Sequence, residues 1–198
     1  MSDEPGSGMS TAPAALPGGT PARVYLRPVH RRDRSEFLAL MQESRALHEP
    51  WINPPLTPYA FQNYLARTQR DDHEGLLVCT RDGHAITGVI NINNIVRGTF
   101  LSASLGYYVA GRHAGRGYMQ EGLELVKDYA CRSLGLHRLE ANIQPDNHRS
   151  LALVRRCGFV KEGFSTGFLF LDGAWRDHER WAFVDPRRAL HHSERFEG

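Results

Sequence analysis

The stretch that decides the fold is Leu105-Gly106-Tyr107-Tyr108-Val109, followed closely by Arg112-His113-Ala114-Gly115-Arg116-Gly117-Tyr118. An apolar strand pattern leads here into a basic, glycine-rich turn, and from Met119 onward apolar residues recur at helical spacing. Glycine lets the backbone approach a ligand closely, and the N–H groups at a helix N-terminus point toward anions. The pattern therefore predicts a phosphate-binding turn, with a plain structural connection as the alternative.

Single positions in this turn exclude two common phosphate-binding loops. A dinucleotide fingerprint requires a glycine three residues after Gly117, where the chain has Gln120. A nucleoside-triphosphate loop requires Gly-Lys followed by Ser or Thr, and Gly117-Tyr118 does not supply it. The spacing Arg-x-x-Gly-x-Gly, from Arg112 to Gly117, therefore indicates a different phosphate-containing ligand.

Composition and charge favour one globular domain without a dedicated role in nucleic-acid binding. The chain has 198 residues, of which 41% are hydrophobic and 23% charged, and its formal net charge is +2. No apolar run is long enough to span a membrane, and the first residues lack the features of a secretory signal, so a cytoplasmic location is expected. Three widely separated cysteines predict reduced thiols and no metal site.

The order of the predicted elements indicates a mixed α/β (α+β) class. Residues 1–22 are expected to form a disordered tail, residues 23–185 a single domain, and residues 186–198 a polar tail. Strands are expected at Val24–Pro28, Leu76–Thr80, Ile86–Ile95 and Arg138–Ile143. A further strand is expected to end at Val109, and two more should flank the turn at Asp172-Gly173. Helices are expected after a capping box at Asp33 and Glu36, from Thr57-Pro58, from the glycine turn to about Leu134, and from Asp146 or Asn147 to Gly158. This order predicts a central twisted mixed sheet of about seven strands with helices on both faces.

Further motifs carry a resemblance to a known family. They are Leu47-x-x-Pro50-Trp51, Gly88-Val89-Ile90-Asn91, Asn94-x-Val96-Arg97-Gly98, Leu105-Gly106-Tyr107, Asn147-x-Arg149-Ser150, Gly158-Phe159-x-Lys161-Glu162-Gly163 and Asp172-Gly173-x-Trp175-Arg176-Asp177-His178. From about Val24 to Val184 the chain resembles the GCN5-related N-acetyltransferases (GNAT), and in particular their ribosomal-protein-alanine (RimJ/RimL-like) branch. The resemblance implies the GNAT fold and acetyl transfer from acetyl-CoA to an amine, most simply the N-terminal amine of an alanine-starting ribosomal protein.

The resemblance also implies where acetyl-CoA binds. The pantetheine arm would pair with the backbone of Tyr107, Tyr108 and Val109, in a gap between two diverging strands. The pyrophosphate would bind at the turn formed by Arg112, His113, Ala114, Gly115, Arg116, Gly117 and Tyr118. Asn142 and Asn147 would flank the thiol end, and no metal is implied.

The candidate catalytic residues are Ser150 and Glu49. Many enzymes of this fold place a tyrosine proton donor where this chain has Val154, so Ser150, one turn earlier on the same helix face, is expected to protonate the leaving thiolate. Ser150 as a helix-capping residue is the alternative. Glu49, beside Trp51, is the candidate general base, and a solvated surface carboxylate is the alternative reading.

Trp51, Asn91 and Asn93 are the candidates for binding the acceptor, since the two asparagines share one face of a strand. Equally simple structural roles for them stay open: a core cover for Trp51 and a fraying strand end for the asparagines. Two other functions also remain, acetylation of a small amine such as a polyamine, and a non-catalytic module that binds CoA or a ribosomal precursor. The sequence leaves open whether the protein is a monomer or a homodimer.

Overall fold

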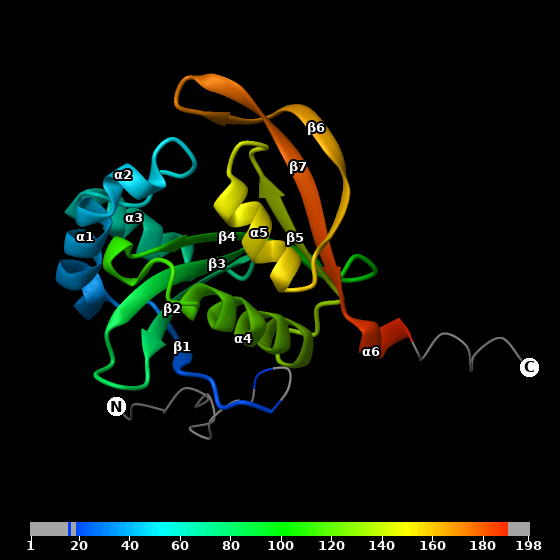
Figure 1. Ribbon diagram of the computed structural model, residues 1–198, viewed down its shortest axis with the longest axis horizontal. Helices are drawn as coiled ribbons and strands as arrows, with labels where there is room; N and C mark the ends of the chain where they lie inside the picture. Colours follow the sequence, from blue (N-terminus) through cyan, green and yellow to red (C-terminus); the bar gives the residue numbers. More distant parts are fainter. Residues whose placement is uncertain (1–15, 17–18, 190–198) are drawn as a thin grey trace, which may run out of the picture.

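The computed structural model describes residue 16 and residues 19–189, which form one seven-stranded sheet in the order β1-β2-β3-β4-β5-β7-β6. Its strands are β1 Val24–Pro28, β2 His73–Thr80, β3 Ile86–Val96, β4 Ser102–Val109, β5 Arg138–Ile143, β6 Val160–Leu171 and β7 Ala174–Val184. The longer helices are α1 Arg34–Glu43, α3 Pro58–Arg67, α4 Tyr118–Arg132 and α5 His148–Arg156, with the short α2 Arg45–His48, α6 Pro186–Ala189 and two 3-10 turns, η1 Arg31–Asp33 and η2 Gly111–His113. Helices lie on both faces of this mixed sheet, as predicted (Figure 1).

Most of the predicted strand positions are confirmed. β1 and β5 have the predicted bounds, whereas β2 begins three residues earlier than expected, at His73. Every neighbouring pair is antiparallel except β4 and β5, which are parallel and joined through α4. α4 is thus the crossover helix that the glycine turn predicted.

Two apolar layers hold the helices to the sheet. On one face, Leu76 and Val78 of β2 pack with α4 and α5; on the other, Leu77 and Cys79 pack with α1 and α3. The alternation follows from the two-residue period of a strand. α4 lies close against the sheet because it meets glycine there: a Cβ on Gly88 would lie 2.4 Å from Met119 Cε.

The capping predictions were partly right. Thr57 accepts the Ala60 N–H at 3.2 Å, and the Asn147 side chain accepts the Ser150 N–H at 3.2 Å. The predicted capping box of Asp33 and Glu36 is wrong. The Asp33 carboxylate instead accepts the His30 N–H at 2.7 Å and two hydrogen bonds from Arg27.

Most of the two predicted tails lies outside the described residues, which omit 1–15, 17–18 and 190–198. Ala22, inside the predicted N-terminal tail, is buried against the α4 face of the sheet. In the part of the chain that the structure describes, no helix is both long and apolar enough to cross a membrane.

Candidate active site

The centre of the site is the point where β4 and β5 diverge. Their parallel pairing runs from Ser102 with Arg138 to Leu105 with Ala141 and stops there, although β4 continues to Val109. Just after β4, the Ala110 N–H donates to Thr87 O of β3 at 2.8 Å. Backbone groups along a strand point alternately to its two neighbours, so those of Tyr107 and Val109 face the β5 side. The sheet therefore leaves strand-pairing backbone groups of β4 available beyond Leu105, as the predicted pantetheine site requires.

The glycine turn follows directly and is open to solvent. η2 leads into Gly115 and Gly117, whose φ angles are +76° and +80°, and α4 then begins at Tyr118. Only glycine adopts this left-handed conformation readily. A Cβ on Gly115 would have no heavy atom within 4 Å, so the turn has room for a ligand against its backbone. The residues fit a pyrophosphate on the α4 N-terminus.

An ion pair behind this turn was not predicted. Glu121, in the first turn of α4, is buried, and its carboxylate accepts the Arg23 backbone N–H at 2.7 Å and Arg23 Nε at 2.6 Å. Arg23 Nη2 also donates to Arg116 O at 2.9 Å, and its guanidinium lies 4.9 Å from the centre of the Tyr118 ring. Arg23 thus joins the end of the turn to the first turn of α4.

The two arginine side chains of the turn, Arg112 and Arg116, are exposed, and Arg112 forms an ion pair. The Arg112 guanidinium is paired with Glu43 at the end of α1, and this pairing lowers the pKa of the Glu43 carboxyl. His113 lies between them and Tyr118, with its ring centre 6.0 Å from that of Tyr118. Burial lowers the pKa of His113, so its ring is mostly neutral near pH 7.

Ser150 and Tyr107 form a hydroxyl pair. The Ser150 Oγ lies 2.6 Å from the Tyr107 hydroxyl, and either oxygen can be the donor. The cap of α5 is the Asn147 side chain, which accepts the Ser150 backbone N–H, and the Ser150 hydroxyl bonds Tyr107 of β4. Burial raises the pKa of Tyr107, which keeps its phenol protonated. The sequence indicated a role for the Tyr107 backbone but not for its side chain.

Asn142 lies just beyond the last paired residues of β4 and β5. Its Oδ1 is buried and has no hydrogen-bond partner within the described chain. A buried acceptor without a partner is costly unless a ligand supplies a donor. Asn147, by contrast, uses its Oδ1 to begin α5.

The loop after α2, which holds two of the predicted site residues, contacts the β6–β7 hairpin. Glu49 is exposed and paired with Arg45 at 2.6 Å, and Trp51 is half-buried. Asn53 Nδ2 donates to Asp172 Oδ1 at 2.7 Å, so this loop touches the hairpin turn, which arches toward it in Figure 1.

Asn91 and Asn93 lie on the α3 side of β3. Asn91 is buried, and its Oδ1 accepts the Tyr64 hydroxyl at 2.7 Å. Asn93 is half-buried, and its backbone carbonyl accepts the Ser104 hydroxyl at 3.3 Å. The amide of Asn91 is thus engaged by the protein itself.

His48 is a buried residue at the site that the sequence did not single out. Its Nε2 lies 2.8 Å from Val109 O, and its ring centre lies 5.6 Å from that of Tyr108. A lone histidine near Trp51 carries no local pattern that distinguishes it from a core residue.

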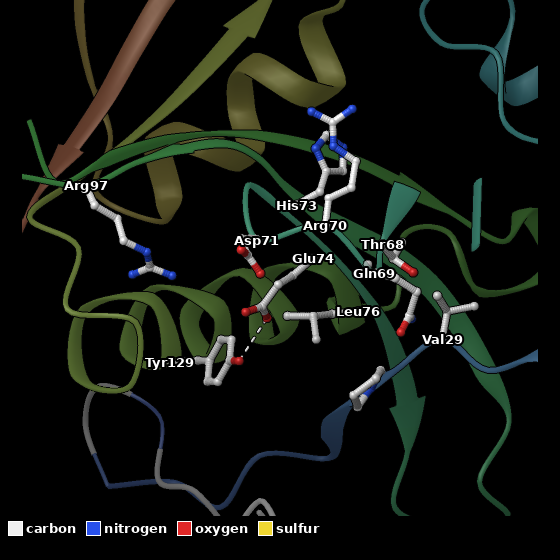
Figure 2. Close-up of a pocket in the computed structure, with 12 residues that line it drawn as sticks. Val29, Thr68, Gln69, Arg70, Asp71, His73, Glu74, Leu76, Arg97 and Tyr129 are labelled. Atoms are coloured by element: carbon white, nitrogen blue, oxygen red, sulfur yellow. Dashed lines mark hydrogen bonds between the residues drawn. The ribbon is translucent and has the colours of Figure 1, made fainter. Parts of the chain in front are cut away.

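A hollow of about 530 Å³ lies at the other end of α4, away from the glycine turn (Figure 2). Figure 2 shows Glu74 and Tyr129 facing each other in it, with Arg97 nearby. In the described part of the chain no group of three His, Cys, Asp or Glu side chains is placed to hold a metal ion.

Comparisons with known proteins agree with this geometry. The chain matches the acetyltransferase (GNAT) domain over residues 23–160. It is 34% identical to the ribosomal protein uS5-alanine N-acetyltransferase of Escherichia coli K12 over 175 residues, 84% of this chain and 90% of that protein. It is 24% identical to the spermidine N(1)-acetyltransferase of Vibrio cholerae over 177 residues, 87% of this chain and 99% of that protein.

Among solved structures, Mycobacterium smegmatis RimJ in complex with CoA-disulfide is similar, with a TM-score of 0.76 and 27% identity. The match covers 83% of each chain. The family match also runs through the glycine turn and both diverging strands. The chain therefore belongs to the GCN5-related N-acetyltransferases, the enzymes that transfer acetyl groups to amines.

Proposed function

We propose that this enzyme acetylates the N-terminal α-amine of a protein, most simply a ribosomal protein that begins with alanine, with acetyl-CoA as donor. The observation that carries the proposal concerns the proposed acceptor side, which is the loop after α2 and the β6–β7 hairpin. Glu49, the carboxylate at the start of this loop, is paired with Arg45. A polyamine carries several positive charges and needs unpaired carboxylates, whereas a peptide N-terminus carries one amine and needs none beyond a proton acceptor.

Acetyl-CoA is proposed to bind along β4 and the glycine turn. The backbone groups of Tyr107 that face β5 would pair with the pantetheine arm, which extends toward Val109, and the N–H groups at Gly115 to Tyr118 would bind the pyrophosphate. Arg112 and Arg116 add positive charge beside it. The unpaired Oδ1 of Asn142 would accept a hydrogen bond near the thiol end.

The reaction is a direct attack of the neutral amine on the thioester carbonyl. The C–N bond forms, the tetrahedral oxyanion collapses, and the C–S bond breaks to release CoA thiolate. A backbone N–H near Val109 would stabilise the oxyanion, and one such donor is worth about 3 kcal/mol. The Ser150–Tyr107 pair has two hydroxyl protons and one mutual hydrogen bond, so one proton remains for the departing sulfur.

The amine must lose a proton, and an α-amine does so readily. Its unperturbed pKa is about 7.7–8.0, so a sizeable fraction is neutral near pH 7 without a strong base. Glu49 is the proposed acceptor of the remaining proton, through water, because its carboxylate is exposed beside Trp51.

The acceptor peptide is proposed to enter between the loop after α2 and the β6–β7 hairpin. Phe168, Phe170 and Trp175 of this hairpin are all exposed, and the last two stack edge to face. Such a surface suits an extended protein segment better than a small polar amine. Trp51 and Asn93, which are half-buried, would contact its first residues.

The acceptor assay compares three substrates near neutral pH. They are a peptide with a free N-terminal alanine, the same peptide with that end blocked and an internal lysine, and spermidine. The free alanine peptide should react fastest, and the lysine peptide about two orders of magnitude more slowly, because at that pH so little of its side-chain amine is neutral. Mass spectrometry locates the acetyl group. Preference for spermidine would favour the small-amine function, and no transfer to any amine despite CoA binding would favour the non-catalytic module.

A further inference from the structure

His48 is the residue outside the proposed catalytic pair that reaches the reacting end of β4. It is 4% exposed, at the last position of α2. Its Nε2 lies 2.8 Å from Val109 O. A carbonyl can only accept, so Nε2 carries the hydrogen, while the buried Nδ1 has no partner in the described chain. Burial lowers the pKa of His48, so the ring is neutral near pH 7.

The carbonyl that His48 holds belongs to the diverging part of the sheet. Val109 is an odd-numbered residue of β4, so its backbone N–H and C=O face the β5 side, beyond the last pair at Leu105 and Ala141. Within the residues that the structure describes, no strand pairs with Val109 on that side. Instead, the His48 side chain of α2 donates a hydrogen bond to the Val109 oxygen.

Two further hydrogen bonds hold the backbone just after β4. Gly111 N–H donates to the Ser44 Oγ at 2.7 Å, and that hydroxyl donates to Leu40 O at 2.6 Å. The end of β4 is therefore held by side chains at the two ends of the short helix α2, Ser44 just before it and His48 at its last position. Ser44 bonds Gly111, which lies beyond the strand, and His48 bonds Val109, the last residue of the strand.

We propose that His48 is a positioning residue for acetyl transfer, which holds the Val109 carbonyl and so fixes the end of β4 with the N–H of Val109, in the preceding peptide, directed at the developing oxyanion. This inference rests on the proposed oxyanion donor near Val109. The Nε2–H also satisfies a carbonyl oxygen that would otherwise present negative charge close to that oxyanion. His48 acts through Val109 and not on the substrate.

Two substitutions distinguish the roles of the two ring nitrogens of His48, Nε2 and Nδ1. The amide nitrogen of glutamine can reach the place of Nε2, so His48→Gln keeps the donor to Val109 O. Asparagine reaches only the place of Nδ1, so His48→Asn loses it. His48→Gln should keep kcat near that of the wild type, and His48→Asn should lower it about tenfold, the rate equivalent of one ordinary hydrogen bond. The KM for acetyl-CoA should be unchanged in both.

A pH profile distinguishes positioning from proton transfer. Imidazole and imidazolium both carry hydrogen on Nε2, so positioning predicts the same pH dependence of kcat/KM for wild type and His48→Gln. If Nδ1 were the general base, His48→Gln would be as slow as His48→Asn and would lose the acidic limb of the profile, which would overturn the proposal. Wild-type kcat in a folded His48→Asn would overturn it as well.

Two controls keep the outcome separate from the proposed function. Calorimetric binding of CoA to the wild type tests the glycine turn and not His48, so failure there leaves the comparison of kcat values intact. If His48→Asn does not fold, as judged by its thermal transition, His48→Gln alone decides: full turnover with the wild-type pH profile supports positioning, and a loss of turnover contradicts it.

Discussion

The two ends of α4 differ in what they offer a ligand. At the N-terminal end, the glycine turn presents backbone N–H groups with few side chains around them. At the C-terminal end, the hollow in Figure 2 is lined by many polar side chains, which include Arg70, Glu74 and Tyr129. The hollow looks richer in chemistry, but several of its polar side chains are already bonded to other protein groups, although the buried His73 Nε2 has no partner among the described residues.

The pairings make this difference explicit. Arg70 bonds Asp72 twice, at 2.9 and 2.8 Å, and the Tyr129 hydroxyl donates to Glu74 at 2.8 Å. At the other end, the groups without a partner among the described residues include backbone groups of β4, the Nδ1 of His113 and the Oδ1 of Asn142. Binding capacity follows unsatisfied groups more closely than the number of polar side chains. Four substitutions test this comparison.

The largest effect is expected for Gly117→Val. A β-branched residue is strained at a φ of +80°, and its Cβ would lie 3.1 Å from Arg23 Nη2. We expect CoA affinity to fall about a hundredfold or more by calorimetry, with the fold retained. Gly83→Val is the matched control, because Gly83 has a φ of +76° in the turn between β2 and β3, outside the glycine turn, and a Cβ there would have no heavy atom within 4 Å. Equal CoA affinity in wild type and Gly117→Val would remove the glycine turn from the site.

Ser150→Ala should affect the chemical step. Loss of the hydroxyl pair should lower kcat about tenfold to a hundredfold, below the upper range for general acids, because a thiolate leaves well unaided. The KM for acetyl-CoA should change little, and Tyr107→Phe should share part of the loss.

Thr57→Ala is the contrasting variant for this test. It removes a cap from α3 and should cost about 1 kcal/mol of stability with kcat unchanged. If Ser150→Ala behaves in the same way, with lower thermal stability and full turnover, Ser150 has only a structural role.

A smaller effect is expected from Arg23→Met. It leaves the buried carboxylate of Glu121 without its cation, one helical turn from the proposed pyrophosphate site. The KM for acetyl-CoA should rise about tenfold, since an uncompensated negative charge there repels the anion. Adding Glu121→Gln should restore most of the affinity. A double variant as weak as the single one would show that the guanidinium itself, and not charge balance, matters.

Much of the fold follows from local patterns in the sequence. β1, β5, the Thr57 and Asn147 caps and the left-handed Gly117 depend on residues that are close in sequence, so periodicity and capping rules predict them. The predicted capping box at Asp33 failed because Arg27, on the adjacent strand, competes for the same carboxylate. The charged hydrogen bonds from Arg27 outweigh a helix-capping bond, which is worth only about 1 kcal/mol.

The side-chain pairings at the site that sequence reasoning missed all join residues that are far apart in the sequence. Arg23 and Glu121 are 98 positions apart, Tyr107 and Ser150 are 43 apart, and His48 and Val109 are 61 apart. No short motif contains both members of such a pair. The backbone part of the site could be predicted, whereas its side-chain pairing required the tertiary structure.

The smallest effect is expected for Glu74→Gln, in the hollow at the far end of α4. If that region serves only structure, kcat and the KM for acetyl-CoA should match the wild type, and only stability should respond. Burial raises the pKa of Glu74 above its ordinary value. The folded protein thus binds this proton more tightly than the unfolded chain does, and stability contributed by the protonated carboxyl is lost as pH rises from about 4.3 through the raised pKa. Glutamine cannot ionise and still accepts from Tyr129, so the melting temperature of Glu74→Gln relative to the wild type should be higher at pH 7 than at pH 4. A change in kcat without a change in stability would instead make the hollow part of the catalytic apparatus, and the contrast between the two ends of α4 would fail.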